Sequence, residues 1–313
     1  VENFFDTIDV DIKDDVEFTP AGSKKWDTKK YIDKRTRISR VIDSLKNDEP
    51  PEIICFSEVE NKAVLRDLIN STWMAGSQYE IIHYESADRR GIDNALLYRE
   101  NKFKILFSRN IPVNLRDTNE KRKGDTRGIL YVKGIVLETD TLHIFVNHWP
   151  SRYYGRDATA PLRAYTASVL REKVDSLFAL NENVKILIVG DLNDEPFDTS
   201  ITKALKCNHD FTSIRKNALY NTTHHFDVTK GEGTIKYKGN WQVFDQIIVS
   251  GTLLDNQQIY TTRDHTRIYN KPFLLTGDTA FSGTQPKRTF NRDDYLDGYS
   301  DHLPVYIDLI VRL

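Results

Sequence analysis

The chain has 313 residues, of which 39% are hydrophobic and 29% are charged, and its formal net charge is −2. This length and apolar content allow a large buried core, and the near-zero charge argues against a protein that holds nucleic acid mainly by bulk positive charge. Two cysteines give no support to a disulfide framework or a thiolate metal site, and Cys55, inside "EIICF", is predicted to be a buried free thiol.

The predicted elements are a few helices among many strands. The first is a helix over 30–48, whose apolar face is formed by Ile38, Val41, Ile42 and Leu45. Strand-length apolar runs follow at 52–58, 79–84, 94–99, 103–107, 129–138 and 142–149. A second helix is expected over 162–180, with an apolar face of Leu162, Tyr165, Val169, Leu170, Val174 and Leu177. Further strands are expected at 184–190, 243–250 and 304–311. Helices that cover two sheets packed face to face would bury all of these runs.

The chain shows no linker, repeat or low-complexity tract, so we predict a single domain over 1–313. The polar segments 111–127 and 261–300 are predicted to be loops around a site. The charged segment 24–40 is interpreted as the solvated face of the first helix and its lead-in, with a phosphate-contacting patch as the alternative. No apolar run approaches the ~20 residues that span a membrane.

Polar side chains that can carry chemistry stand beside the ends of the predicted strands. Asp245 differs, because it lies inside an apolar strand, where a buried carboxylate must be paired. Each residue alone also fits a turn, a helix start or a hydrogen-bonded structural histidine, but those roles do not explain why all of these residues occur next to predicted strands. The other members of this set are Glu58, His148, Asp191, Asn193, Asp301 and His302.

This set suits hydrolysis at phosphorus. Carboxylates without thiolates favour a hard cation, Mg²⁺ or Mn²⁺, which neutralises phosphate oxygens. A carboxylate can take a proton from water, and histidines can donate to the phosphoryl group or the leaving group. The chain has neither a G-x-S-x-G elbow nor a P-loop, which argues against acyl transfer and nucleotide-driven work.

The ordered motifs "VENFFD", "FSEVEN", "DTRGILYVKG", "NHWPSR", "GDLND", "VFDQIIVS" and "YSDHLPV" resemble the endonuclease/exonuclease/phosphatase superfamily, which shares the fold of deoxyribonuclease I. The resemblance spans nearly the whole chain, and its phrasing is similar to bacterial members of unassigned substrate that are often exported. It implies a four-layer α/β/β/α sandwich of two mixed sheets, with helices on the outer faces and the site at one end.

The resemblance also implies the metal and water sites. Glu58 would be the principal metal ligand, with Asp301 beside the metal. Glu2 falls where some members keep an acidic residue near the metal. The family pattern places an Asn directly before Val1, and we interpret its absence from this chain as trimming. Asp191 would activate the attacking water, and Asn193 would orient that water and contact the phosphate.

The remaining implied roles concern the histidines and arginines. His302 would bind a phosphoryl oxygen, oriented by Asp245. His148 would be a donor near the leaving group, oriented by Asp93. Arg127 would contact phosphate, and further local phosphate contacts are expected from Arg152, Arg156 and Arg163, although Arg163 equally fits a plain helix surface. The neighbouring acids Asp194 and Glu195 are interpreted as turn or helix-start residues.

We therefore predict a Mg²⁺- or Mn²⁺-dependent phosphodiesterase with nucleic acid as its substrate. One alternative is a phosphoinositide or sphingomyelin phosphodiesterase, which would use an apolar protrusion built from Ile268, Tyr269, Phe273, Leu274, Leu275 and Phe281. A second alternative is a non-catalytic binding protein on the same fold. We expect a soluble monomer without a stable protein partner, exported after removal of a leader that this chain lacks.

Overall fold

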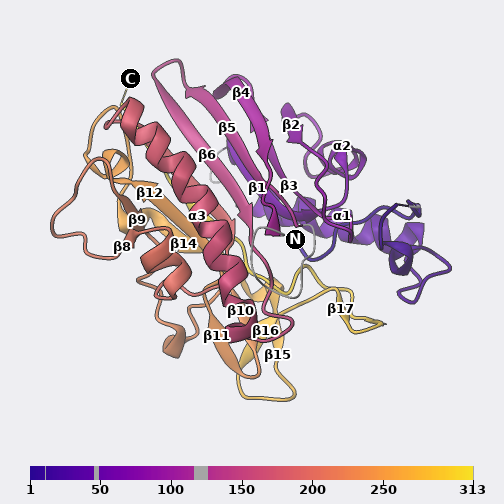
Figure 1. Cartoon of the computed structure of the whole chain (residues 1–313). Coiled ribbons are helices and arrows are strands. Elements are labelled where there is room, and N and C mark those ends of the chain that lie inside the picture. Colours follow the sequence, from indigo (N-terminus) through magenta and orange to yellow (C-terminus); the bar gives the residue numbers. More distant parts are fainter. Residues whose placement is uncertain (11, 46–48, 116–125, 313) are drawn as a thin grey trace.

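The computed structural model describes residues 1–10, 12–45, 49–115 and 126–312. The end of the predicted helix 30–48 and most of the predicted loop 111–127 therefore lie outside the described residues. The α-helices of the described part are α1 (Thr28–Ser44), α2 (Lys62–Ile69) and α3 (Arg156–Leu180). Figure 1 shows α3 lying along one face of a large sheet, with α1 and α2 beyond its other face.

The large sheet has seven strands in the order β4-β5-β6-β7-β12-β9-β8. It is mixed, because β6 is parallel to β7 and β8 is parallel to β9 while the other neighbours are antiparallel. Its strands are β4 (Phe103–Ile111), β5 (Ile129–Val136), β6 (Asp140–His148), β7 (Lys185–Asp191), β12 (Asp245–Ser250), β9 (Leu219–Asn221) and β8 (Cys207–Asn208).

The face of this sheet opposite α3 is covered by three smaller antiparallel units. The first has the order β1-β3-β2, with strands β1 (Ile53–Val59), β3 (Asp93–Arg99) and β2 (Tyr79–His83). The others pair β14 (Thr266–Ile268) with β19 (Val305–Ile307), and β13 (Ile259–Tyr260) with β20 (Ile310–Val311). The expected last strand, 304–311, is thus divided into β19 and β20.

Alternation along the strands separates three apolar cores. In β7, Ile186 and Ile188 pack with α3, whereas Leu187 and Val189 face the second layer of strands. Both faces of this strand are covered, which explains its continuous apolar run. A third core joins α1 and α2 to the outer face of the β1-β3-β2 sheet, through residues such as Phe56. The predicted four-layer α/β sandwich is confirmed.

Several elements differ from the sequence predictions. Helix α2 was not predicted, because its eight residues give little periodicity; Asn61 caps it by accepting hydrogen bonds from the amides of Ala63 and Val64. Helix α3 begins at Arg156 rather than at 162 and passes through Pro161. Segment 261–300, expected to be loop, also contains the short strands β15 (Leu275–Gly277), β16 (Thr284–Pro286), β17 (Phe290–Asn291) and β18 (Asp294–Tyr295).

One further hairpin, β10 (Ile235–Tyr237) with β11 (Asn240–Gln242), lies next to β16. Among the described residues, no helix combines the length and hydropathy that a bilayer crossing requires.

Candidate active site

Three neighbouring strands of the large sheet present polar residues at one edge. His148 ends β6, Asp191 ends β7 and Asp245 begins β12, and the strand register places His148 beside Asp191 and Asp191 beside Asp245. The strands that hold them are buried on both faces and therefore rigid. Strand ends far apart in the sequence thus bring these three predicted residues together.

A tight turn after β7 fixes the Asp191 carboxylate. Before this turn, Gly190, the last but one residue of β7, has φ +129°, and a Cβ there would lie 1.9 Å from the carbonyl oxygen of Asn147, so no larger residue fits. Asn193 adopts φ +50° and donates its backbone amide to Oδ1 of Asp191 at 2.8 Å. Its Nδ2 lies 3.2 Å from Oδ2 of Asp191 and donates to the carbonyl of Trp149 at 3.1 Å. Asn193 therefore links the turn to the end of β6.

Glu58 enters the site from the opposite sheet. The pairing of β1 with β3 shifts register between Ser57 and Val59, and Glu58 at this bulge has φ +66°. Its Oε2 accepts a hydrogen bond from the amide of Asn3 at 2.9 Å, and its Oε1 lies 3.8 Å from Nε2 of His148. A left-handed backbone in a residue other than Gly costs free energy and is common at functional sites. The bulge thus turns the Glu58 carboxylate toward the large sheet.

His302 forms a short pair with Asp245, with Nδ1 2.7 Å from Oδ2. Burial alone would lower the pKa of His302, but Asp245 and the nearby Asp191 raise it well above its usual value. Burial would likewise raise the pKa of Asp245, yet His302 holds it below its usual value. The amide of Asp245 donates to Oγ1 of Thr234 at 3.2 Å. The pair is therefore an imidazolium and a carboxylate, with Nε2 of the ring also protonated.

The pKa values of Asp191 and His148 are shifted in opposite directions. Burial raises the pKa of Asp191 to about 7, with His302 acting against this rise and Asp245 adding to it. Burial, together with Arg127 and other cations, lowers the pKa of His148 well below its usual value, so this ring is neutral. Nε2 of His148 lies 3.6 Å from Oδ2 of Asp191. A carboxyl with a pKa near neutrality can accept and return a proton.

The expected orientation of His148 by Asp93 is wrong. Asp93 Oδ2 lies 3.1 Å from Nε2 of His83, and Asp93 Oδ1 accepts from the amide of Ser86 at 2.9 Å. Nδ1 of His148 is buried and has no hydrogen-bond partner among the described residues. The fully buried Asp93 therefore orders the segment between β2 and β3.

The expected metal ligands Glu2 and Asp301 share an arginine. Nη2 of Arg288 lies 3.2 Å from Oε1 of Glu2 and 3.3 Å from Oδ2 of Asp301. Oε2 of Glu2 accepts from the amide of Thr289 at 2.5 Å. Arg288, which the sequence did not indicate, thus bridges the two carboxylates with its single positive charge.

Of the three expected metal ligands, Glu58 still fits a hard divalent ion. The ligand atoms of Glu2, Glu58 and Asp301 do not gather within 4.8 Å; among the described residues, that spacing is met by His83, Glu85 and Asp93. Mg²⁺ commonly binds through one or two carboxylates and completes its shell with water and phosphate oxygens. A bulge-presented Glu58, close to His148, meets this requirement.

The buried side chain of Lys34, from α1, interacts electrostatically with Glu2 and Asp301. Its Nζ is fully buried and donates to Oγ1 of Thr289 at 2.5 Å and to the carbonyl of Tyr299 at 2.7 Å. Burial lowers its pKa to about 8, while Glu2 and other acids oppose the shift. The sequence did carry a signal, because Lys34 falls on the same helical face as Ile38 and Val41.

Most of the expected phosphate-binding arginines hold the protein's own acids. Arg127 is buried, paired with Asp88 at 2.8 Å and donating to the carbonyl of Trp149 at 2.8 Å. Arg163, expected at a phosphate or on the helix surface, is 0% exposed and its Nε lies 2.7 Å from Oδ1 of Asp194. These arginines are therefore structural in this arrangement.

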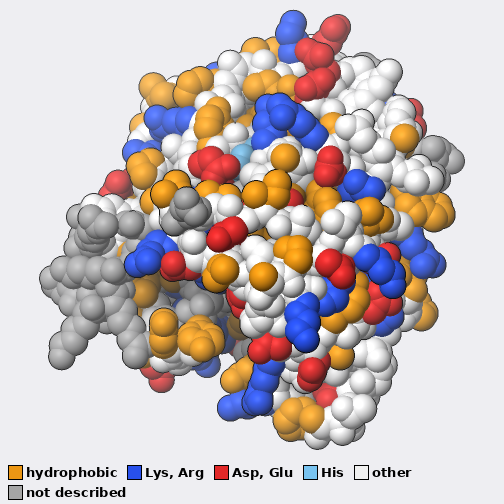
Figure 2. Space-filling view, turned by 90° about the vertical axis from the view of Figure 1, so that its right-hand side faces the viewer, with side chains coloured by type: hydrophobic (Ala, Val, Ile, Leu, Met, Phe, Trp, Pro, Cys, Tyr) orange, Lys and Arg blue, Asp and Glu red, His pale blue; other side chains and the backbone are white. Residues whose placement is uncertain are grey.

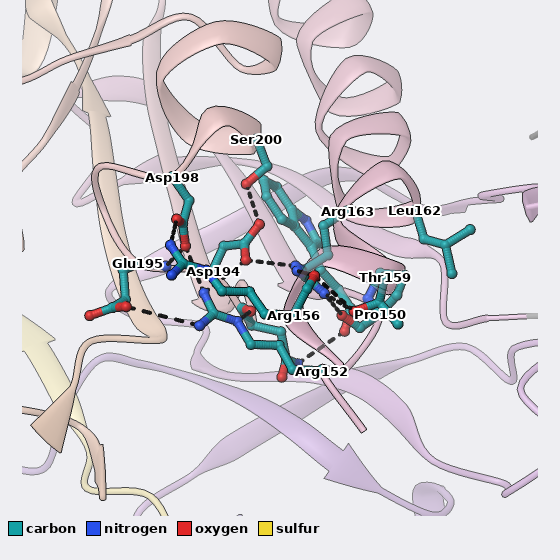
Figure 3. Close-up of polar contacts among 12 residues, drawn as sticks. Pro150, Arg152, Arg156, Thr159, Leu162, Arg163, Asp194, Glu195, Asp198 and Ser200 are labelled. Atoms are coloured by element: carbon teal, nitrogen blue, oxygen red, sulfur yellow. Dashed lines mark hydrogen bonds and ion pairs between the residues drawn. The ribbon is translucent and has the colours of Figure 1, made fainter. Parts of the chain in front are cut away.

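Figure 3 shows a wider network of charged and polar side chains between the start of α3 and the segment after β7. We call this network the brace; its members are Arg152, Arg156, Arg163, Asp194, Asp198 and Ser200. Nη2 of Arg152 lies 2.8 Å from Oδ1 of Asp194 and 2.6 Å from Oδ2 of Asp198, and Arg156 also pairs with Asp198. Ser200 donates to Oδ2 of Asp194 at 2.6 Å. The brace adjoins Asn193, whose carbonyl accepts from Nε of Arg152 at 2.7 Å.

The apolar residues of segment 261–300 do not form the expected protrusion. Tyr269 and Leu274 are buried in a small core with Val41, and Phe273 packs against them. Phe281 is the member of that set with a large exposed fraction, 49%. Figure 2 shows Lys and Arg side chains interspersed with Asp and Glu on the face at the right of Figure 1.

Comparisons with known proteins agree with this fold. The model of the Endonuclease/Exonuclease/phosphatase family matches residues 1–311, and no curated protein matches the chain. An endonuclease/exonuclease/phosphatase family protein from Bacteroides thetaiotaomicron has a TM-score of 0.55 and 15% identity, covering 90% of this chain and 89% of that chain. A humanized D. rerio TDP2 has a TM-score of 0.57 and 13% identity over 91% and 94% of the two chains.

A mannosyl-6-phosphatase from Bacteroides thetaiotaomicron has a TM-score of 0.52 and 16% identity, covering 88% of this chain and 90% of that chain. At these identities the structural likeness shows the fold alone, whereas the family model matches the sequence itself. The chain belongs to the endonuclease/exonuclease/phosphatase family, whose members hydrolyse phosphodiesters or phosphate esters.

Proposed function

We propose that this protein is a divalent-metal-dependent phosphodiesterase that cleaves nucleic acid. The observation that carries the proposal is the convergence of Asp191, His148 and the His302–Asp245 pair on Glu58 at one end of the sandwich. A proton acceptor, a neutral ring, a charged donor and an anionic metal ligand are the groups that phosphodiester hydrolysis requires.

A Mg²⁺ or Mn²⁺ ion held by Glu58 would supply charge neutralisation at the phosphate oxygens. Asp191 takes the proton of the attacking water, for which its pKa of about 7 is suited at neutral pH. Asn193 holds the Asp191 carboxylate and positions the water. His302 donates a charge-assisted hydrogen bond to a phosphoryl oxygen, and its charge is maintained by Asp245. His148 lies within reach of the leaving oxygen.

The burial of Tyr269 and Leu274 supports a nucleic acid over a lipid headgroup, because the apolar protrusion that a membrane enzyme would use is part of a core. The net charge of −2, with the interleaved charges on the face seen in Figure 2, is consistent with few phosphate contacts and modest affinity. A non-catalytic role is disfavoured, since the strand ends bring the buried Asp191, His148 and the His302–Asp245 pair to one edge of the sheet, an arrangement typical of active sites.

A substrate panel tests the proposal. Plasmid DNA, RNA, a diester dye, phosphoinositides and sphingomyelin are incubated with the protein, with and without Mg²⁺ or Mn²⁺ and with EDTA. We expect metal-dependent cleavage of nucleic acid and the dye. Glu58→Gln, Asp191→Asn and His302→Ala should each lower kcat by roughly 10²-fold or more with the fold retained. EDTA-resistant cleavage, or full activity in any of the three variants, contradicts the proposal.

A further inference from the structure

We infer that a cluster of stacked rings beside the active site binds an unpaired nucleobase of the substrate strand. The ring cluster consists of Phe197, His209, Phe211 and His224, and an adjoining hollow extends it. This inference rests on the proposed function and deepens it, because it assigns the substrate class to single-stranded or locally unpaired nucleic acid.

The strand register places the ring cluster near the catalytic edge. β9 is antiparallel to β12 and therefore runs in the same direction as β7, so the chain leaves both β9 and β7 toward the edge that holds Asp191. Asn221, at the end of β9, lies opposite Ile248, three residues along β12 from Asp245. With about 4.8 Å between strands and about 3.3 Å per residue, Asn221 lies roughly 15 Å from Asp191. His224 follows in the next turn.

Four contacts join the rings into one surface. Phe197 stacks on His209 at 4.7 Å between centroids, and Phe211 stacks on His224 at 5.3 Å. His209 and His224 meet edge to face at 5.4 Å, as do Phe197 and His224 at 6.3 Å. Phe197 nevertheless has 66% of its surface exposed, so it is available to a further ring.

Hydrogen bonds to the backbone hold the two histidines. Nε2 of His209 lies 2.8 Å from the carbonyl of Pro196, and Nδ1 of His224 lies 2.6 Å from the carbonyl of Asn221. A carbonyl only accepts, so each of these nitrogens carries the proton and the other ring nitrogen is an acceptor in the neutral form. Burial lowers the pKa of both rings, which keeps them neutral. The rings therefore act as aromatic faces, with an acceptor at the edge.

An open hollow of about 470 Å³ continues from these rings. It is lined by His209, Asp210, Phe211, Thr212, Arg263 and Asp264. Arg263 is ion-paired with Asp264 at 3.1 Å, so its charge is already matched. The two aspartates make the hollow unfavourable for a phosphate, and the hydroxyl and carboxylate oxygens can receive the amino group of a base.

These features select a planar, uncharged, hydrogen-bonding ring. Base–aromatic stacking contributes about 1–3 kcal/mol per base and tolerates any base. Bases paired in a duplex have their faces covered, so the rings favour an unpaired nucleotide. The reacting phosphate of the same strand would lie at Asp191 and His302, where the positive charge is. A strand that spans the two sites thus places its phosphate and its base in separate, chemically matched positions.

The test compares a base-bearing oligonucleotide with one of equal length in which the nucleotides flanking the scissile phosphate are abasic. Phe197→Ala is the test variant. Phe107→Ala is the matched control, because Phe107 is 48% exposed and lies on β4, at the opposite edge of the same sheet. We measure kcat/KM for both oligonucleotides with Mg²⁺, and the affinity of both for the Asp191→Asn protein and its Phe197→Ala and Phe107→Ala derivatives by fluorescence anisotropy.

We expect the wild type to prefer the base-bearing strand by 10-fold or more in kcat/KM. Phe197→Ala should lower that preference by about 5- to 10-fold, in the range expected for one stacking contact, whereas Phe107→Ala should not change it. Equal use of both strands by the wild type, or an unchanged preference in Phe197→Ala, overturns the inference. Equal competition by ribose 5-phosphate and a nucleoside monophosphate overturns it as well, because the base would then not be recognised.

The two proposals fail in different ways. If neither oligonucleotide is cleaved, the proposed function fails, while the anisotropy comparison still decides whether the ring cluster binds a base. If both are cleaved at equal rates and bound equally, phosphodiester hydrolysis stands and the ring cluster is not a base-binding site.

Discussion

The pair of Arg163 and Asp194 in the brace offers a sharp test of how the site is held. Both side chains are buried, with exposed fractions of 0% and 4%, and their ion pair spans 2.7 Å. Nη1 of Arg163 also donates to Oγ1 of Thr159 at 2.7 Å, and Nη2 donates to the carbonyl of Arg156 at 2.9 Å. Arg163→Met keeps much of the volume and removes the charge and all of these contacts.

Removing one partner of a buried ion pair costs about 3–5 kcal/mol, because the other charge is left without compensation. Here Arg152 remains 2.8 Å from Asp194 and Ser200 still donates to it. We therefore expect the lower end, about 3 kcal/mol. For a chain of this size that loss corresponds to a Tm lower by about 5–10 °C. Asn193 directly precedes Asp194 in the sequence, so a displaced Asp194 should also move Asn193, and kcat should fall as well.

Urea unfolding followed by circular dichroism at pH 7 gives the free energy of unfolding. The control is Arg156→Met, since Arg156 also pairs with Asp198 in the brace but its side chain is 57% exposed; exposed pairs contribute about 0–1 kcal/mol. If Arg163→Met costs no more than Arg156→Met, the buried pair does not hold the segment after β7. A second variant, Asp194→Asn, should reproduce the loss.

Three further changes test the strand ends and the strand interior. Gly190→Ala should lose roughly 3 kcal/mol or more of unfolding free energy, because its Cβ would overlap the carbonyl of Asn147; a soluble protein with unchanged Tm contradicts this. Asp245→Asn should lower the pKa of His302 and cut kcat by roughly 10²-fold, and an NMR titration in which that pKa stays unchanged rejects the pairing. Burial lowers the pKa of His143 to about 4. The unfolded chain therefore takes up the proton first as pH falls from about 6.5 to 4, and the unfolding free energy should drop by about 3 kcal/mol in that window. His143→Gln should remove this part of the pH dependence.

The sequence predicts the strands well because their cause is local. Leu187 and Val189 alternate with Ile186 and Ile188, and both faces of β7 are covered, so the apolar run is continuous. The ladders in 261–300 were missed because strands of two or three residues carry no periodicity. They form only because the rest of the chain supplies their partners.

Site residues whose position depends on local sequence could likewise be predicted, whereas those whose contacts depend on distant segments could not. The position of Asp191 could be predicted from the sequence, since a buried apolar run followed by Gly190 indicates that the next residues lie at the edge of the sheet. The partner of Asp93 could not, because His83 and His148 are equally available in sequence terms and only the packing of β2 against β3 selects His83. Arg163 was misjudged for a related reason: its acidic partner lies 31 positions away, after another strand.

The arginines also explain how a nearly neutral protein would act on nucleic acid, the substrate that we propose. Arg127 and Arg163 are enclosed by the protein's own acids and hold the ends of β6 and β7 in place. The free positive charge of the site is then concentrated at His302, with the metal ion that Glu58 would hold. Such a site neutralises one phosphate strongly and the flanking phosphates weakly, which is the opposite of a basic groove. In the proposed function, uncharged contacts therefore contribute to recognition of the rest of the strand, and the 66% exposed ring of Phe197 is a candidate for such a contact.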